Sequence, residues 1–130
     1  MGGTVLFICT GNTCRSPMAE ALLRAALPER SGWEAASAGI LCAGGRRASE
    51  NAIIAVREIG GDLAGFASQP VKGGMLFDAA LIVPMTRMHE ALLLQGWPKL
   101  KPKVRLMLSF DPGSPPDAEV PDPFGGSLVA

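Results

Sequence analysis

The sequence has no excess of charge of either sign and no long run of apolar residues. Its 130 residues contain 12 Lys and Arg against 12 Asp and Glu. A chain without a basic excess lacks the electrostatic footprint of a protein that binds nucleic acid or anionic lipid. The first apolar run, at residues 5–9, is much too short for a signal-peptide core or a membrane span. We therefore predict a cytoplasmic protein whose partners include neither nucleic acid nor a membrane.

Cysteine and histidine are scarce, and their placement argues against two kinds of architecture. The chain has three cysteines, Cys9, Cys14 and Cys42, and one histidine, His89. An odd number of cysteines argues against a framework of structural disulfides, so the thiols are predicted to be reduced. The four residues also lack the paired spacing of zinc ligands, and no metal site is predicted. His89 is expected to be a polar residue on the surface of a helix.

The chain is long enough for one hydrophobic core, and we predict a single domain over residues 1–130. Apolar runs bounded by turn residues alternate with helix-like patterns. Strands are predicted over residues 5–9, 33–38, 79–85 and 104–110, and helices over residues 16–27, 49–59 and 86–95. Ser16 and Ser49 are the expected N-caps of the first two helices. This alternation predicts an α/β fold with a parallel sheet covered by helices on both faces.

The segment CTGNTCRS, residues 9–16, joins the first predicted strand to the first predicted helix. A helix N-terminus presents unpaired N–H groups and the positive end of the helix dipole, and both favour an anion such as phosphate. Gly11 and Asn12 tolerate the positive φ that turns successive N–H groups inward. The guanidinium of Arg15 can hold two phosphate oxygens at once. We predict that this segment, called the anion loop below, binds a phosphate group.

Cys9 lies at the base of the anion loop and is the predicted nucleophile. The Ser16 hydroxyl is expected to donate to its thiolate, and the Arg15 side chain to stabilise the transition state. The predicted phosphate ligands are the loop residues that follow the nucleophile: Thr10, Gly11, Asn12, Thr13, Cys14 and Arg15. These groups suit attack on phosphorus with formation of a phosphocysteine intermediate. The loop is not a nucleotide-binding P-loop, because the chain has no G-x-x-x-x-G-K-[ST] motif.

A phosphoryl transfer of this kind also needs a proton for the leaving group. The loop VPDPFGGS, residues 120–127, follows the last predicted strand and offers Asp122 between two prolines, which stiffen its backbone. We predict that Asp122 is the general acid. The predicted catalytic residues are therefore Cys9, Arg15 and Asp122.

Three motifs together resemble the low-molecular-weight phosphotyrosine protein phosphatase family. They are the C-x5-R-S-P opening at residues 9–17, SAG at residues 37–39 and the D-P-F loop at residues 122–124. The resemblance implies a three-layer fold with a four-stranded parallel sheet and helices on both faces. It also implies that Asn12 and Ser37 hold the anion loop, that no cofactor is needed and that Asp122 later acts as a base. The family's last helix would begin near residues 126–127, so this C-terminal helix is expected to be missing.

Within that family the sequence is most similar to bacterial protein arginine phosphatases. Three segments carry this similarity: CTGNTCRSPMAE, MTRMH at residues 85–89 and DPFGGS. Tyrosine-directed members usually carry an aliphatic residue where this chain has Thr13, whose hydroxyl can orient a polar group near a P–N bond. The resemblance thus implies a protein carrying phosphoarginine as the substrate, with phosphotyrosine as the alternative. Phe66 stands where the family often has a histidine, and part of the polar support of the loop is expected to be missing.

Two other functions are compatible with the same loop. Arsenate reductases share it, but they need further cysteines after the third strand, and none follows Cys42. An inactive protein that only binds oxyanions is the second alternative. Cys14 is expected to be a small buried apolar residue, although a Cys9–Cys14 disulfide would silence the nucleophile under oxidation.

Overall fold

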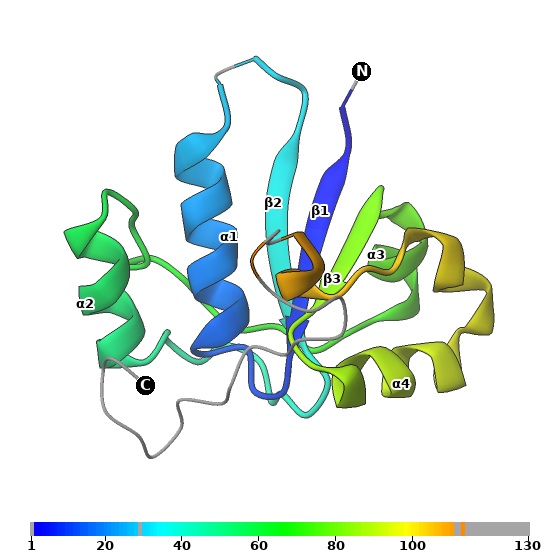
Figure 1. The fold of residues 1–130 in the computed structure, drawn as a ribbon. Coiled ribbons are helices and arrows are strands. Elements are labelled where there is room, and N and C mark those ends of the chain that lie inside the picture. Colours follow the sequence, from blue (N-terminus) through cyan, green and yellow to red (C-terminus); the bar gives the residue numbers. More distant parts are fainter. Residues whose placement is uncertain (1, 29, 111–112, 114–130) are drawn as a thin grey trace.

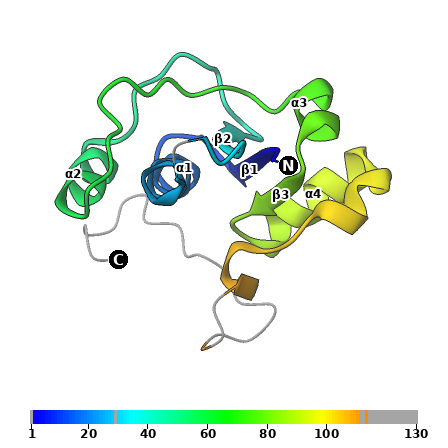
Figure 2. The same cartoon turned by 90° about the horizontal axis from the view of Figure 1, so that it is seen from above.

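The computed structural model describes residues 2–28, 30–110 and 113, which form a three-layer α/β fold (Figure 1). In this part of the chain the parallel sheet has the strand order β2-β1-β3. The strands are β1 (Thr4–Cys9), β2 (Glu34–Gly39) and β3 (Leu81–Pro84), and the helices are α1 (Arg15–Ala26), α2 (Glu50–Glu58), α3 (Gly73–Asp78) and α4 (Arg87–Gly96). Figure 2 shows α1 and α2 on one side of the sheet and α3 and α4 on the other. The predicted α/β class with helices on both faces is confirmed.

The central strand β1 has the apolar run expected of a strand that is buried on both faces. Leu6, Phe7 and Ile8 are all buried, and the strand pairs in parallel with both neighbours. The register sets Cys9 opposite Gly39 at the end of β2, and Ile8 opposite Pro84 at the end of β3. The carboxyl ends of the three strands therefore meet at one edge of the sheet, where ligands bind in folds of this kind.

Alternation along β1 decides which face receives the thiol. Successive side chains of a strand point to opposite faces. Ile8 packs into the cluster that contains Leu93 of α4, whereas Phe7 and Cys9 pack with Ala19 of α1. The Cys9 side chain is therefore on the face that α1 covers, beside the start of that helix.

The two predicted N-caps have different outcomes. Ser49 caps α2, because its side chain accepts a hydrogen bond of 3.2 Å from the N–H of Ala52. The prediction for Ser16 is wrong: α1 begins at Arg15, with Cys14 as the cap residue and without a side-chain cap bond. Ser16 lies inside the first turn of α1 and is buried. Its hydroxyl contacts the sulfur of Cys9, at the end of β1, and does not bond to the N–H groups at the helix end.

The strand predicted over residues 104–110 is not formed. Val104 makes one isolated parallel bridge with Ile82 of β3. The ladder ends there because the Leu106 carbonyl accepts bonds from both the N–H of Ser109, at 3.1 Å, and its hydroxyl, at 2.6 Å. Local serine bonds of this kind compete with a sheet ladder. Two 3-10 helices flank this short segment: η1 (Pro98–Lys103) precedes Val104, and η2 (Met107–Phe110) follows Leu106. The described part of the chain thus has three strands, and the predicted fourth strand is not confirmed there.

The short helix α3 was not expected either, because it begins with Gly73 and Gly74, which are poor helix formers. Its fully buried Leu76 anchors it to the core between the sheet and α4. Across the described residues, none of the helices combines the length and the apolar character that crossing a membrane requires.

Candidate active site

The thiol of Cys9 lies at the end of β1 and next to the first turn of α1. It is only 3% exposed, and its Sγ lies 2.8 Å from the Oγ of Ser16. The positive end of the α1 dipole and a hydroxyl donor therefore face the same sulfur atom. Both stabilise negative charge on that atom, which is what a nucleophilic thiolate needs.

The side-chain amide of Asn12 fixes the position of that hydroxyl. Its Nδ2 donates to the Oγ atoms of Ser16 and Ser37, both at 2.9 Å, and its Oδ1 accepts from the N–H of Gln69 at 2.8 Å. A backbone N–H can only donate, so Oδ1 must face Gln69 and Nδ2 must face the two serines. Ser16 Oγ accepts one of these hydrogens, which leaves its own hydrogen for the sulfur of Cys9.

Asn12 also supplies the turn of the anion loop. It is fully buried and has a φ of 55°, a left-handed conformation that asparagine adopts more readily than most residues. Gly11 is not among the residues with positive φ, so the predicted freedom is used at Asn12 and not at Gly11. One residue therefore sets both the backbone path and the hydrogen bonds of the loop.

The carbonyl groups of the anion loop are bound by segments outside it. The N–H groups of Ile40, Leu41 and Ser49 donate to the carbonyls of Cys9, Thr10 and Thr13 at 2.9, 2.9 and 2.7 Å. In a trans peptide the C=O and the following N–H point in opposite directions. The N–H groups that follow these three carbonyls are consequently directed away from the neighbouring segments. This arrangement suits a cradle of amides for an oxyanion.

Gly39 allows the end of β2 to approach the anion loop closely. A Cβ at this position would lie 2.7 Å from the Thr10 carbonyl oxygen and 3.0 Å from the Asn12 Cβ. No real Cβ tolerates such a contact with backbone, so only glycine fits here. The glycine of the SAG motif is thus explained by packing against the loop.

The other predicted site residues are placed as follows. Arg15 is the first residue of α1 and is 9% exposed, and Thr13 is half-buried in the loop. Cys14 is half-buried and packs against the cluster between α1 and α2, and the described cysteines are free thiols. Asp122 lies outside the described residues, so its role as the acid stays a prediction.

His89 is not on the surface, which corrects the prediction for it. It is fully buried in the first turn of α4, and its Nε2 lies 2.8 Å from the Oγ1 of Thr10. The Thr86 hydroxyl accepts a bond of 3.2 Å from the N–H of His89 and caps the helix. The T-x-x-H spacing therefore both starts α4 and places the histidine against the anion loop.

Several supporting residues were not expected from the sequence. Gln69 donates from its backbone to Asn12 and, at 2.8 Å, from its side chain to the carbonyl of Ser37. The Ser37 hydroxyl donates to Oε1 of Glu20 at 2.6 Å, and Arg24 bonds to Oε2 of the same carboxylate. Polar support of the loop is thus present, although Phe66 packs in an apolar cluster where a histidine was expected.

A metal site is not visible in the portion of the chain that the structure covers. No three His, Cys, Asp or Glu side chains of the described residues come together in a way that would hold an ion.

Comparison with known proteins connects this geometry to a family. Residues 4–129 match the family described as low molecular weight phosphotyrosine protein phosphatase. A protein-arginine-phosphatase of Geobacillus stearothermophilus is 39% identical over 124 residues, 95% of this chain and 80% of the relative. A probable low molecular weight protein-tyrosine-phosphatase, AmsI of Erwinia amylovora, is 39% identical over 106 residues, 82% of this chain and 72% of the relative.

One solved structure bears on the reacting group. It is a mutant of the YwlE arginine phosphatase with a phosphorylated active-site serine, and it superposes with a TM-score of 0.84 at 34% identity. The match covers 97% of this chain and 82% of that one.

We predict that Ser16→Ala slows the alkylation of Cys9 by iodoacetamide about tenfold at neutral pH, since a hydrogen bond to a charged group contributes about 1.5–3 kcal/mol. Mass spectrometry of the Cys9 peptide measures the rate separately from the other two thiols. Ser31→Ala, in the turn after α1, is the matched control and should react like the wild type. Equal rates in all three proteins would show that the Ser16 hydroxyl does not act on the sulfur.

We predict that Gly39→Ala weakens the binding of vanadate at least about tenfold, because the new Cβ displaces the peptide of Thr10. Calorimetry on the folded variant measures the affinity. Gly74→Ala in α3 is the control, because a Cβ there meets nothing within 4 Å. Unchanged vanadate affinity in Gly39→Ala would contradict the close packing of β2 against the loop.

Proposed function

Because the chain belongs to the low molecular weight phosphotyrosine protein phosphatase family, we propose that it hydrolyses phosphorylated protein side chains through a phosphocysteine intermediate. The observation that carries the proposal is the 2.8 Å contact between the sulfur of Cys9 and the hydroxyl of Ser16 at the start of α1. A cytoplasmic location is part of the proposal, since a catalytic thiol works only while it is reduced.

The first step transfers the phosphoryl group to sulfur. The Cys9 thiolate attacks phosphorus while the backbone amides of the anion loop and the Arg15 guanidinium hold the non-bridging oxygens. An S–P bond forms, and the bond from phosphorus to the leaving group breaks. Asp122, the acid predicted from the sequence, gives its proton to the leaving nitrogen or oxygen. The mutant relative with a phosphorylated active-site serine supports such an intermediate.

The second step returns the enzyme to its starting state. Asp122, now a carboxylate, takes a proton from a water molecule that attacks the phosphocysteine. The S–P bond breaks, inorganic phosphate leaves and the electron pair returns to the Cys9 sulfur. Ser16, held by Asn12, donates to that sulfur as its charge returns. The hydrogen-bonded hydroxyl therefore stabilises the leaving group of the step.

Phosphoarginine is the substrate that we propose. The protein-arginine-phosphatase relative supports it, and so does Thr13, a polar residue in the loop. Once it has given its proton to the leaving group, Asp122 is a carboxylate that can accept two hydrogen bonds from the departing guanidinium, which a phenol cannot offer. The probable tyrosine phosphatase AmsI has the same 39% sequence identity to this chain, although over fewer residues, and it makes phosphotyrosine the second candidate substrate.

The test of the proposal is turnover of a phosphoarginine peptide and a phosphotyrosine peptide of the same surrounding sequence. We expect the higher kcat/KM for phosphoarginine, and no turnover of either by Cys9→Ser. A higher value for phosphotyrosine would replace the arginine assignment. Oxyanion binding without any turnover by the wild type would leave only a binding protein.

We further predict that Thr13→Ile shifts the preference toward the phosphotyrosine peptide, because an aliphatic side chain packs beside an aromatic ring and offers no hydroxyl to a P–N leaving group. The ratio of the two kcat/KM values is the measurement, and Thr13→Ser is the matched control that keeps the hydroxyl. An unchanged ratio in Thr13→Ile would remove Thr13 as a determinant of specificity.

A further inference from the structure

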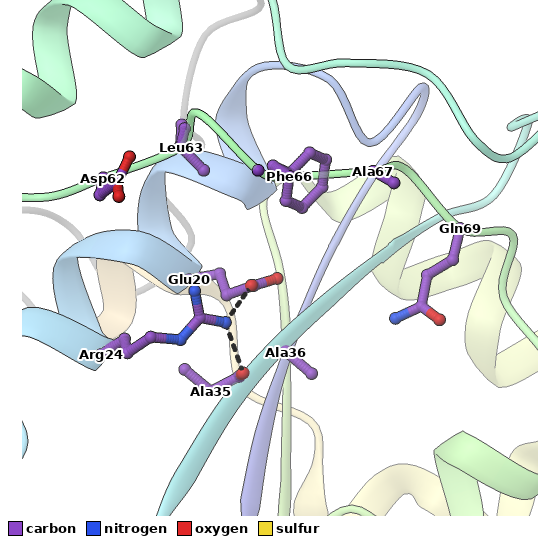
Figure 3. A pocket seen from close by; sticks show the side chains of 10 residues that line it. Glu20, Arg24, Ala35, Ala36, Asp62, Leu63, Phe66, Ala67 and Gln69 are labelled. Atoms are coloured by element: carbon purple, nitrogen blue, oxygen red, sulfur yellow. Dashed lines mark hydrogen bonds and ion pairs between the residues drawn. The ribbon is translucent and has the colours of Figure 1, made fainter.

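A pocket lies beside α1, and Gln69, whose N–H donates to Asn12 of the anion loop, is among the residues that line it. It has a volume of about 550 Å³ and is formed by α1, β2 and the segment 62–69. Figure 3 shows Glu20 and Arg24 of α1 facing the segment that carries Asp62 and Phe66. This volume is in the range of small-molecule sites, about 300–1,000 Å³. We call it the Glu20 pocket.

The charged groups of the Glu20 pocket favour a cation. Glu20 and Asp62 supply two carboxylates against the one guanidinium of Arg24, so the charged lining has a net charge of −1. Glu20 is 7% exposed, and a carboxylate has about four acceptor positions, of which Ser37 and Arg24 occupy two. The remaining acceptor capacity lies at the carboxylate of a side chain that is 10% exposed.

Phe66, which also packs against the apolar cluster between α1 and α2, lines the same pocket. An aromatic face attracts a cation placed over it, and a planar guanidinium stacks there more readily than an ammonium group. The guanidinium fork also matches the geometry of a carboxylate. From this combination we propose that the Glu20 pocket binds the side chain of an unmodified arginine.

The pocket is connected to the nucleophile by a chain of hydrogen bonds. Glu20 accepts from Ser37 at 2.6 Å, Ser37 accepts from Asn12 at 2.9 Å, and Asn12 donates to Ser16 at 2.9 Å. Ser16 lies 2.8 Å from the sulfur of Cys9. A guanidinium that binds the remaining acceptor positions of Glu20 withdraws negative charge from the carboxylate, and so weakens the bond that it accepts from the Ser37 hydroxyl. The Asn12 amide then loses a fixed partner, and turnover falls.

If the chain hydrolyses phosphoarginine as proposed, this connection gives the pocket a regulatory role. A phosphoarginine side chain carries negative charge, which a lining of net charge −1 repels, whereas the dephosphorylated arginine is attracted. The pocket thus distinguishes product from substrate, and an arginine bound there lowers the rate at which further phosphoarginine is hydrolysed.

Binding is tested by calorimetry with N-acetyl-arginine amide, an arginine without terminal charges. N-acetyl-citrulline amide has nearly the same shape and no charge, and it should bind at least about tenfold more weakly, because bonds to charged groups are the stronger ones. Equal affinity for the two probes, or no binding of either, would overturn the proposal. This measurement needs no turnover, so it stands apart from any failure of the proposed function.

Variants place the probe in the pocket. Asp62→Asn removes an exposed charge and Phe66→Leu removes the aromatic face while keeping apolar bulk; each should weaken binding of the arginine probe about threefold. Asp78→Asn, an exposed carboxylate at the end of α3, is the control and should bind like the wild type. Undiminished affinity in the double variant Asp62→Asn/Phe66→Leu would place the probe elsewhere and reject the pocket.

Steady-state kinetics with an aryl phosphate test the connection. The arginine probe should lower kcat without raising KM in the wild type and in Asp78→Asn. In Ser37→Ala the probe should still bind, but kcat should no longer respond to it relative to that variant's own uninhibited rate. A raised KM would put the probe in the anion loop, and an unchanged wild-type kcat at saturating probe would refute the coupling.

Discussion

The side-chain amide of Asn12 is the interaction on which the rest of the site depends. Its three hydrogen bonds join the first turn of α1, the end of β2 and the segment before α3. Because one of its hydrogens goes to Ser16, the serine hydroxyl is left to face the thiol of Cys9. Its positive φ also turns the anion loop. Removing this amide leaves buried partners unsatisfied, which is far more costly than losing an exposed hydrogen bond.

The fold places these groups with little freedom. Period-two alternation puts the Cys9 side chain on the α1 face, and the register of β1 with β2 sets Gly39 beside it. A glycine at that position lets the strand end touch the loop. From the opposite side, His89 of α4 bonds to Thr10. The anion loop is therefore held from both layers of helices, which fixes the orientation of its amides, and preorganised dipoles of this kind are the main source of electrostatic catalysis.

Several local patterns were predicted correctly, and of the long-range contacts only the one between Asn12 and Ser37 was expected, from the family resemblance. The apolar run of β1 and the Ser49 cap depend on neighbouring residues. The burial of His89 depends on a partner 79 residues away, and the bond from Gln69 to Asn12 uses a backbone N–H across 57 residues. A backbone donor has no signature in the side-chain sequence. The prediction that Ser16 caps α1 failed for another reason. A serine before a proline has the pattern of an N-cap even when its hydroxyl bonds to a thiol, as it does here.

A double-mutant cycle between Asn12 and Ser16 tests whether the Asn12 amide acts on the Cys9 sulfur through the Ser16 hydroxyl. Asn12→Gly keeps the left-handed backbone accessible while it removes the amide, and Ser16→Ala removes the hydroxyl. The measured quantity is kcat/KM for an aryl phosphate in the two single variants and the double variant. If Asn12 acts on the sulfur through Ser16, the double variant loses at least about 1 kcal/mol less than the sum of the single losses. Losses that add within about 0.5 kcal/mol would contradict the account, because they would mean that the two residues act independently.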